Sequence, residues 1–335
     1  MLCFVDDSMP GITRKPCGRY WIYFDAAGNR ITDRDEIDRL NGIGLPPAYG
    51  RAWLCPLPNG HIQAIGYDAR GRKQYRYHPD FRAQQDAAKY DRCAEFGRAL
   101  PKLRRRVRDD LAKRAVTKQA VVAAVVRLLD YEHLRVGNEA YAKENKSFGA
   151  TTLRSHHLKH LGRSVKMRFK GKYGIERELT ITDRRLARIV RRCADLPGQH
   201  LFQYIDDEGQ LQPVSSTDVN DYIRDAMGSE FTAKHFRTWA ASVIAFEQLC
   251  AADETGILLK EMLQPVAEAL GNTPAISRKS YVHPALIEAV KENPRKPIGE
   301  LRCPRATEYL SSAERGLILF LEAQAAADGQ QKKAA

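Results

Sequence analysis

Short apolar runs separated by turn-forming residues fill the amino-terminal part of the chain. The runs with strand character are residues 20–24, 52–55, 61–65 and 73–77. The segments 25–29, 58–60 and 68–71 lie between runs and contain Asp, Asn, Gly or Pro, which favour backbone reversals. The first of these turns predicts that residues 30–32 return as a strand. The pattern as a whole predicts a small antiparallel sheet.

After Pro79 the hydrophobic pattern becomes helical. Apolar positions at helical spacing mark a long amphipathic stretch, namely Phe81, Ala88, Cys93, Phe96 and Leu100. The segment 118–134 is apolar on most of its sides and predicts a buried helix. We therefore expect two domains, a β-rich domain at residues 1–82 and a mainly helical domain at residues 83–335.

Two helix starts can be read from capping-box patterns. Asp33 with Glu36 predicts a short helix in the first domain, and Ser311 with Glu314 predicts the start of a last helix in the second. Beyond that helix, the composition of residues 328–335 predicts a disordered tail.

One β-hairpin is predicted inside the second domain. Val165, Met167 and Phe169 alternate with basic residues, and the chain turns at residues 171–172 before a second strand at residues 178–181. The predicted fold class is α+β. A small antiparallel β-rich amino-terminal domain is followed by a larger, mainly helical domain that carries a β-hairpin.

The charge balance favours a polyanionic partner. The 335 residues include 54 Lys and Arg against 41 Asp and Glu, giving a net charge of +13. Such a surface attracts nucleic acid or an anionic membrane. The most apolar run, residues 120–126, is too short to span a bilayer. Asp6 and Asp7 stand where a secretory signal peptide needs positive charge, so we expect the chain to stay in the compartment where it is made.

Metal, disulfide and nucleotide motifs are missing from the sequence. The seven cysteines are scattered without C-x-x-C spacing, and the histidines show no H-x-x-x-H spacing. This argues against a zinc site and a disulfide framework, and suits a reducing interior. No G-x-x-x-x-G-K-[ST] loop suggests ATP use. We expect no metal and no small-molecule cofactor.

A set of polar residues has the chemistry needed to transfer a phosphoryl group without a metal. They are Arg135 in RVGNEAY, Lys172 in FKGK, Arg237 in KHFR, Asn272 in GNTP and Tyr281 in SRKSY. Two guanidiniums can grip a phosphodiester, and an amide can bind a non-bridging oxygen. An ammonium can protonate a leaving alkoxide, and a phenol can attack phosphorus.

Each of these residues also has an ordinary structural interpretation. Tyr281 could be a packing tyrosine, Arg135 and Arg237 could form salt bridges, and Asn272 could be a turn residue. Lys172 could be a solvated residue at a hairpin tip, with Lys170 as the alternative lysine for its role.

The five strings, in this order, resemble the type IB DNA topoisomerases, most closely the small poxvirus and bacterial enzymes. The resemblance covers nearly the whole chain and implies the fold that topoisomerases IB share with tyrosine recombinases. It selects Lys172 through the pattern F-x-G-K, and Tyr281 through S-[RK]-[RK]-x before the tyrosine. Asn272 departs from the poxvirus and eukaryotic pattern, which has histidine there, so a general acid or base role at this position is disfavoured.

The resemblance also implies DNA contacts outside the catalytic set. The string 71–77 matches a strand of the amino-terminal domain that such enzymes lay in the major groove. Candidates there are Arg72 and Lys73 for phosphates, Gln74 for base edges, and Tyr75 and Tyr77 for phosphates. Tyr141 and one of Ser215 or Ser216 are weaker candidates for phosphate contacts.

The implied activity is relaxation of supercoiled duplex DNA by a protein that clamps the duplex. Tyr281 would cut one strand through a 3′-phosphotyrosyl bond, without ATP or metal, in a monomeric, cytoplasmic enzyme that is nucleoid-associated if the chain is bacterial. Arg135, Arg237 and Asn272 would stabilise the transition state, and Lys172 would be the general acid. Two alternatives stay open: a tyrosine recombinase or integrase, and a non-catalytic architectural DNA-binding protein.

Overall fold

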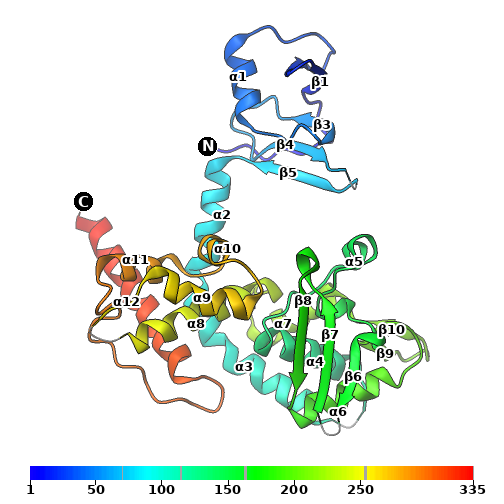
Figure 1. The fold of residues 1–335 in the computed structure, drawn as a ribbon, viewed down its shortest axis with the longest axis vertical. Helices are drawn as coiled ribbons and strands as arrows, with labels where there is room; N and C mark the ends of the chain where they lie inside the picture. The colour runs from blue at the N-terminus through cyan, green and yellow to red at the C-terminus, as the bar shows by residue number, and fades with distance from the viewer. Residues whose placement is uncertain (70, 114, 162–163, 253–254, 335) are drawn as a thin grey trace. The chain divides into compact units, whose positions relative to one another are not determined.

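The computed structural model describes residues 1–69, 71–113, 115–161, 164–252 and 255–334, with side chains left out at 86–88, 160–161, 173 and 328–334. The chain forms two compact units, Met1–Lys89 and Tyr90–Ala335 (Figure 1). The domain boundary predicted near residue 82 falls within helix α2 (Pro79–Asp91), which passes from the first unit into the second.

Antiparallel strands and one helix build the amino unit. Its elements are β1 (Thr13–Cys17), β2 (Tyr20–Phe24), α1 (Arg34–Gly42), β3 (Gly50–Leu54), β4 (Ile62–Tyr67) and β5 (Lys73–Tyr77). Strands β3, β4 and β5 form one sheet in that order, and β1 pairs with β2. The predicted strands and the antiparallel pairing are confirmed, and Asp33 caps α1 as predicted by accepting hydrogen bonds from the Asp35 and Glu36 amides.

One strand prediction in the amino unit was wrong. Residues 30–32 return beside β2 through the antiparallel bridge between Arg30 and Phe24 and the hydrogen bond from the Ile31 amide to the Tyr23 carbonyl at 2.9 Å, but they do not form a regular strand. The strand that pairs with β2 is β1, which has mostly exposed residues with a proline in the sequence TRKPC. A strand without buried alternating residues gives no periodic signal, which is why the sequence did not reveal it.

Helices dominate the second unit. They are α3 (Cys93–Ala112), α4 (Lys118–Tyr131), α5 (Glu139–Asn145), α6 (Arg184–Ala194), α7 (Ser216–Met227), α8 (Ala233–Ala251), α9 (Leu259–Leu270), α10 (Pro274–Ser280), α11 (Pro284–Glu292) and α12 (Ser312–Ala334). The strands are β6 (Leu158–Leu161), β7 (Ser164–Lys170), β8 (Glu176–Ile181), β9 (Gln203–Ile205) and β10 (Leu211–Pro213). The fold is therefore α+β, as predicted.

The core of this unit surrounds α4. Nine of the fourteen residues of α4 are buried, because the apolar positions cover most of the helix surface. Helices α3, α6, α7 and α8 pack around it, and α6 joins it to the sheet (Figure 1). The helix ends at Tyr131, three residues before the predicted end, and the chain then turns into the segment that carries Arg135.

The predicted hairpin is present and has a third strand. β7 pairs with β8 on one side and with β6 on the other, all antiparallel. Val165, Met167 and Phe169 are buried while their neighbours are more exposed, which confirms the alternation read from the sequence. The hairpin turn holds a short 3₁₀ segment, Lys172–Gly174, so that the turn projects Lys172 from the end of two paired strands.

The last helix begins as its capping box predicts. The Ser311 amide donates to Glu314 Oε2 at 2.8 Å, and the Glu314 amide donates to Ser311 Oγ at 3.1 Å. Helix α12 continues to Ala334, whereas residue 335 and the side chains from 328 onward lie outside the described residues, so the predicted tail stays a prediction. No helix in the described ranges is long and apolar enough to cross a membrane.

Candidate active site

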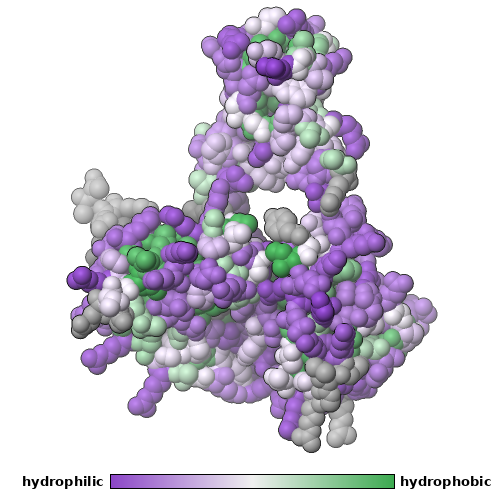
Figure 2. Space-filling model, in the orientation of Figure 1, coloured by the Kyte–Doolittle hydropathy of each residue, from purple (hydrophilic) through white to green (hydrophobic). Residues whose placement is uncertain are grey.

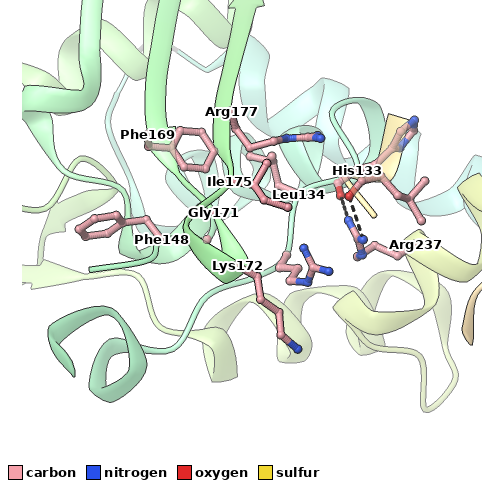
Figure 3. A pocket seen from close by; sticks show the side chains of 13 residues that line it. His133, Leu134, Phe148, Phe169, Gly171, Lys172, Ile175, Arg177 and Arg237 are labelled. Carbon is pink, nitrogen blue, oxygen red and sulfur yellow. Dashed lines mark hydrogen bonds between the residues drawn. The ribbon is translucent and has the colours of Figure 1, made fainter. Parts of the chain in front are cut away.

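Five segments of the second unit meet at one pocket (Figure 3). They are the segment after α4, the segment after α5, the β7–β8 hairpin with its turn, helix α8, and the carboxyl end of α9. The lining residues are His133, Leu134, Arg135, Phe148, Gly149, Phe169, Gly171, Lys172, Ile175, Arg177, Arg237, Leu270 and Gly271. Arg135, Lys172 and Arg237, which are far apart in sequence, therefore lie around one pocket.

Arg237 is almost fully buried in helix α8. Arg237 is only 5% exposed to solvent. Nη1 donates to the His133 carbonyl at 2.5 Å, and Nη2 donates to the Leu270 carbonyl at 3.1 Å, as the dashed lines in Figure 3 show. Burial, with the nearby charge of Arg135, lowers the pKa of Arg237 to about 10. Hydrogen bonds to neutral carbonyls make this burial tolerable without cancelling the charge.

Tyr281 lies beside this guanidinium. It follows directly after α10, and its ring centre is 4.8 Å from the guanidinium carbon of Arg237. Burial of the phenol raises its pKa, but the positive charges and hydrogen bonds of Arg237 and Arg135 outweigh burial, and the pKa of Tyr281 lies below its ordinary value. Cations that stabilise phenolate are what a tyrosine nucleophile requires.

Asn272 is linked to Arg135. Arg135 Nη2 donates to Asn272 Oδ1 at 3.0 Å. The Asn272 backbone amide donates to the Ala267 carbonyl at 2.9 Å, so the residue is held where α9 ends. Its side-chain Nδ2 is buried without a partner in the described part of the protein. The amide therefore has its acceptor occupied and its donor available.

Lys172 is the exposed member of the set. It begins the 3₁₀ segment of the hairpin turn, which the hydrogen bond from the Gly171 amide to the Ile175 carbonyl closes at 2.8 Å. Its side chain extends from the turn in Figure 3. Lys170, the alternative lysine, ends β7 and lines a different cavity together with Lys159 and Arg168.

The weaker phosphate-contact candidates differ in their surroundings. Tyr141 lines a second cavity with Arg135 and Lys172, next to the main pocket. Ser215 caps α7: its hydroxyl donates to Asp218 Oδ2 at 2.6 Å and accepts from the Asp218 amide at 3.1 Å. Ser216 lines a further cavity with Arg154 and Lys143. The S-x-x-D signature of that cap was readable in the sequence.

The candidate DNA-contact residues of the amino unit lie on or next to β5. Arg72 pairs with Asp68 at 2.7 Å, and Lys73 pairs with Asp7 at 2.7 Å. Gln74 donates to Asp68 Oδ2 at 3.1 Å. Tyr75 and Tyr77 are 43% and 44% exposed, and their rings stack with centres 5.9 Å apart. In the view of Figure 2 the surface of this unit is mostly hydrophilic.

Two pocket residues had no signal in the sequence. Arg177 is half-buried in β8, and its Nη2 donates to the Ala269 carbonyl at 3.1 Å and the Glu132 carbonyl at 3.4 Å. Burial, followed by the charge of Arg135, lowers the pKa of Arg177. His133 adopts φ of 52°, a conformation uncommon outside glycine, and presents its carbonyl to Arg237. Arg177 gave no signal in the sequence because it lies between two glutamates, a pattern typical of a surface residue.

Comparison with known proteins agrees with this geometry in both units. Residues 78–297 match the family described as eukaryotic DNA topoisomerase I, catalytic core, and residues 20–68 match the bacterial DNA topoisomerase IB, N-terminal domain. The DNA topoisomerase 1B of Acanthamoeba polyphaga mimivirus is 34% identical over 299 residues, which are 85% of this chain and 89% of that protein. The DNA topoisomerase 1B of Vaccinia virus (strain Copenhagen) is 22% identical over 270 residues, covering 78% and 83% of the two chains. The chain therefore belongs to the type IB DNA topoisomerases.

Proposed function

We propose that this topoisomerase relaxes supercoiled duplex DNA by cutting one strand with Tyr281 and resealing it, without ATP or a metal ion. The observation that carries the proposal is the convergence of Arg237 and Arg135 on Tyr281, with Asn272 hydrogen-bonded to Arg135 and with Lys172 lining the same pocket as the two arginines. These are the groups that an attack by a phenol on a phosphodiester needs.

In the proposed step, Tyr281 Oη forms a bond to phosphorus and the bond to the 5′ oxygen breaks. The phenol proton passes to solvent water as the phenolate forms, which the lowered pKa of Tyr281 favours, and a proton returns from water when religation releases Tyr281. Lys172 gives a proton to the departing 5′ oxygen, and a 3′-phosphotyrosyl bond remains. Religation is the reverse: the 5′-hydroxyl attacks phosphorus, Lys172 takes back the proton, and Tyr281 is released.

The negative charge that develops on the non-bridging oxygens would be stabilised by neighbouring donors. Arg237 and Arg135 make their described hydrogen bonds to neutral oxygens, so their positive charge is not cancelled by a carboxylate among those contacts. Asn272 offers Nδ2 because Arg135 holds its Oδ1. Donors fixed before the reaction stabilise charge without the cost of reorganising at the transition state.

Bond energy is conserved in this scheme, which is why it needs no ATP. The phosphotyrosyl bond replaces one phosphodiester bond by another, and the free strand end can swivel before the 5′-hydroxyl returns. Double-stranded DNA is the proposed partner, and the protein acts as a monomer. In the amino unit, Gln74, Tyr75 and Tyr77 are proposed to contact the duplex along β5, together with Arg72 and Lys73.

Plasmid relaxation tests the proposal. Supercoiled plasmid is incubated with the protein in EDTA without ATP, and topoisomers are separated on a gel. We expect relaxation by the unaltered chain and by the control Tyr131→Phe, since Tyr131 is an exposed tyrosine outside the pocket. Plasmid that stays supercoiled at stoichiometric protein would rule the proposal out.

A further inference from the structure

Two segments of the active site are joined by three successive cross-links. One segment is residues 132–135, after α4, and the other is residues 269–272, at the end of α9. Arg177 Nη2 joins the carbonyls of Glu132 and Ala269. Arg237 joins the carbonyls of His133 and Leu270. The third link is direct, from Arg135 to Asn272.

The three cross-links join positions of the two segments that are offset by the same number of residues. The paired positions are 132 with 269, 133 with 270, and 135 with 272, so the two segments advance in step. The first two links are guanidiniums on backbone carbonyls, that of Arg177 half-buried and that of Arg237 buried, and the third consists of side chains that the proposed reaction uses. Whatever fixes the first two links therefore fixes the separation and orientation of the third.

We propose that Arg177 is a positioning residue of the cleavage reaction, which holds the Arg135–Asn272 pair in place through the carbonyls of Glu132 and Ala269. This inference rests on the proposed function. It gives Arg177 a task distinct from that of Arg237, because Arg237 lies beside Tyr281 whereas the described hydrogen bonds of Arg177 go to the Glu132 and Ala269 carbonyls.

The chemistry of the helix end explains why an arginine suits this place. The last carbonyls of α9 have no amide partner within the helix, and the carboxyl end of a helix carries partial negative charge. A guanidinium supplies several donors and a permanent positive charge, so it can satisfy two carbonyls from different segments at once. Arg177 reaches them from β8, pointing across the pocket in Figure 3.

Gly271 shows how closely Arg177 approaches. A Cβ at this position would lie 2.7 Å from Arg177 Nη1, and the residue has φ of 61°. Both the backbone conformation and the missing side chain therefore let the guanidinium lie against the turn between Leu270 and Asn272.

Two other roles for Arg177 give different results. If Arg177 bound a DNA phosphate itself, its loss would weaken binding and reduce the salt dependence of binding by one contact. If it only supported the fold, its loss would lower the melting temperature and leave the cleavage rate of folded protein unchanged. A positioning residue changes the rate of the bound complex and depends on the pair that it positions.

The test is single-turnover covalent adduct formation on a short duplex with saturating protein. Arg177→Met should slow cleavage about 10²-fold, the cost typical of a displaced catalytic group, with little change in duplex affinity. Arg177→Lys, which keeps the charge and is less disruptive to folding, should lose less. The matched control is Arg168→Met, because Arg168 lies on the same hairpin but is exposed and paired with Glu176. It should cleave at the unaltered rate.

A double-mutant cycle with Asn272→Ala decides the mechanism. If Arg177 acts through Asn272 and Arg135, Arg177→Met should slow the Asn272→Ala protein far less than it slows the unaltered protein. Additive losses in the cycle, or unaltered cleavage by folded Arg177→Met and Arg177→Lys proteins, would overturn the inference. If the unaltered chain itself forms no adduct, the proposed function fails instead, so the two failures are distinguishable.

Discussion

The arginines of the active site and the basic residues of β5 are held by opposite kinds of partner. Arg237, Arg177 and Arg135 donate to backbone carbonyls and to an amide oxygen, all of them neutral. On the amino unit, Arg72 pairs with Asp68 and Lys73 pairs with Asp7. Neutral acceptors satisfy the hydrogen-bond donors of the pocket arginines without offsetting their positive charge. The carboxylates beside Arg72 and Lys73 offset most of the positive charge of those two residues.

This difference shows how one basic protein can use positive charge in two ways. In the pocket, burial and then the charge of Arg135 lower the pKa of Arg177 and of Arg237, which is the cost of holding like charges together away from water. The positive charges of these arginines would then be available to stabilise a phosphate that gains negative charge in the proposed reaction. On and next to β5, an approaching phosphate could exchange with the carboxylate partner of Arg72 or Lys73, so we expect these residues to contribute to attraction rather than to chemistry.

The largest effect should come from Lys172, the proposed general acid. Lys172→Ala should slow cleavage of ordinary DNA roughly 10²–10⁴-fold, the usual worth of a positioned proton donor. On a substrate with sulfur in place of the 5′-bridging oxygen, the thiolate leaves without a proton, so Lys172→Ala should regain most of the rate. Arg135→Ala and Arg237→Ala should regain much less, because their target oxygens are non-bridging.

Lys170→Ala is the matched control for that prediction. It removes the same charge from the same hairpin, two residues away, and should cleave ordinary DNA at close to the unaltered rate. Rescue of Lys170→Ala by the sulfur substrate, or equal rescue of the lysine and arginine variants, would show that the acid has been assigned to the wrong residue.

A smaller loss is expected at Asn272. Asn272→Ala removes the Nδ2 donor and should slow cleavage roughly 10²–10³-fold, as losing one donor to a developing oxyanion does. Asn272→His retains a nitrogen donor and should be tolerated. Full single-turnover activity of the alanine variant would leave Asn272 as a turn residue that ends α9.

The charge left in the pocket should also be visible in the titration of Tyr281. Its pKa lies below the ordinary value because Arg237 and Arg135 outweigh the effect of burial. Tyrosine ionises as pH rises through its pKa, so the phenolate should form at lower pH in the unaltered chain than in Arg135→Gln. The difference in phenolate absorbance between each protein and its Tyr281→Phe counterpart isolates this group. An unchanged midpoint in Arg135→Gln would contradict the electrostatic account.

The smallest effects are expected on β5, and they should appear in binding alone. Lys73→Ala should reduce the slope of log affinity against log salt by about 0.9 if Lys73 contacts one phosphate. Asp7→Asn frees Lys73 from its carboxylate and should tighten binding at low salt. Neither variant should change the single-turnover cleavage rate at saturating protein. A salt slope that stays the same in Lys73→Ala would remove Lys73 from the DNA contacts.

Much of the fold was predictable from the sequence where burial is periodic. The hairpin around Phe169 and the core helix at residues 118–131 gave clear alternating or helical patterns, and the structure has both. Strand β1 was missed because its residues are mostly exposed and polar. The predicted end of α4 lies beyond the observed one, because the apolar residue Leu134 continues the helical pattern after the backbone has left the helix.

The site was predictable only as a set of side chains. Arg135, Lys172 and Arg237 could be singled out because each lies in a distinctive local string. The carbonyl acceptors of Arg237 could not, since a backbone carbonyl has no signature in sequence, and the links between residues 132–135 and 269–272 span more than a hundred positions. Arg177 belongs to this hidden part, because its partners are both main-chain carbonyls.

The central claim is that Tyr281 becomes covalently attached to a 3′ phosphate in the presence of EDTA and without ATP. The direct measurement is to trap the adduct on a short duplex, digest the protein, and identify the modified peptide and the released strand by mass spectrometry. We predict a 3′-phosphonucleotide on Tyr281, a released strand with a 5′-hydroxyl, and no adduct from Tyr281→Phe despite nearly unchanged duplex binding. An adduct on another residue, or one still formed by Tyr281→Phe, would contradict the account.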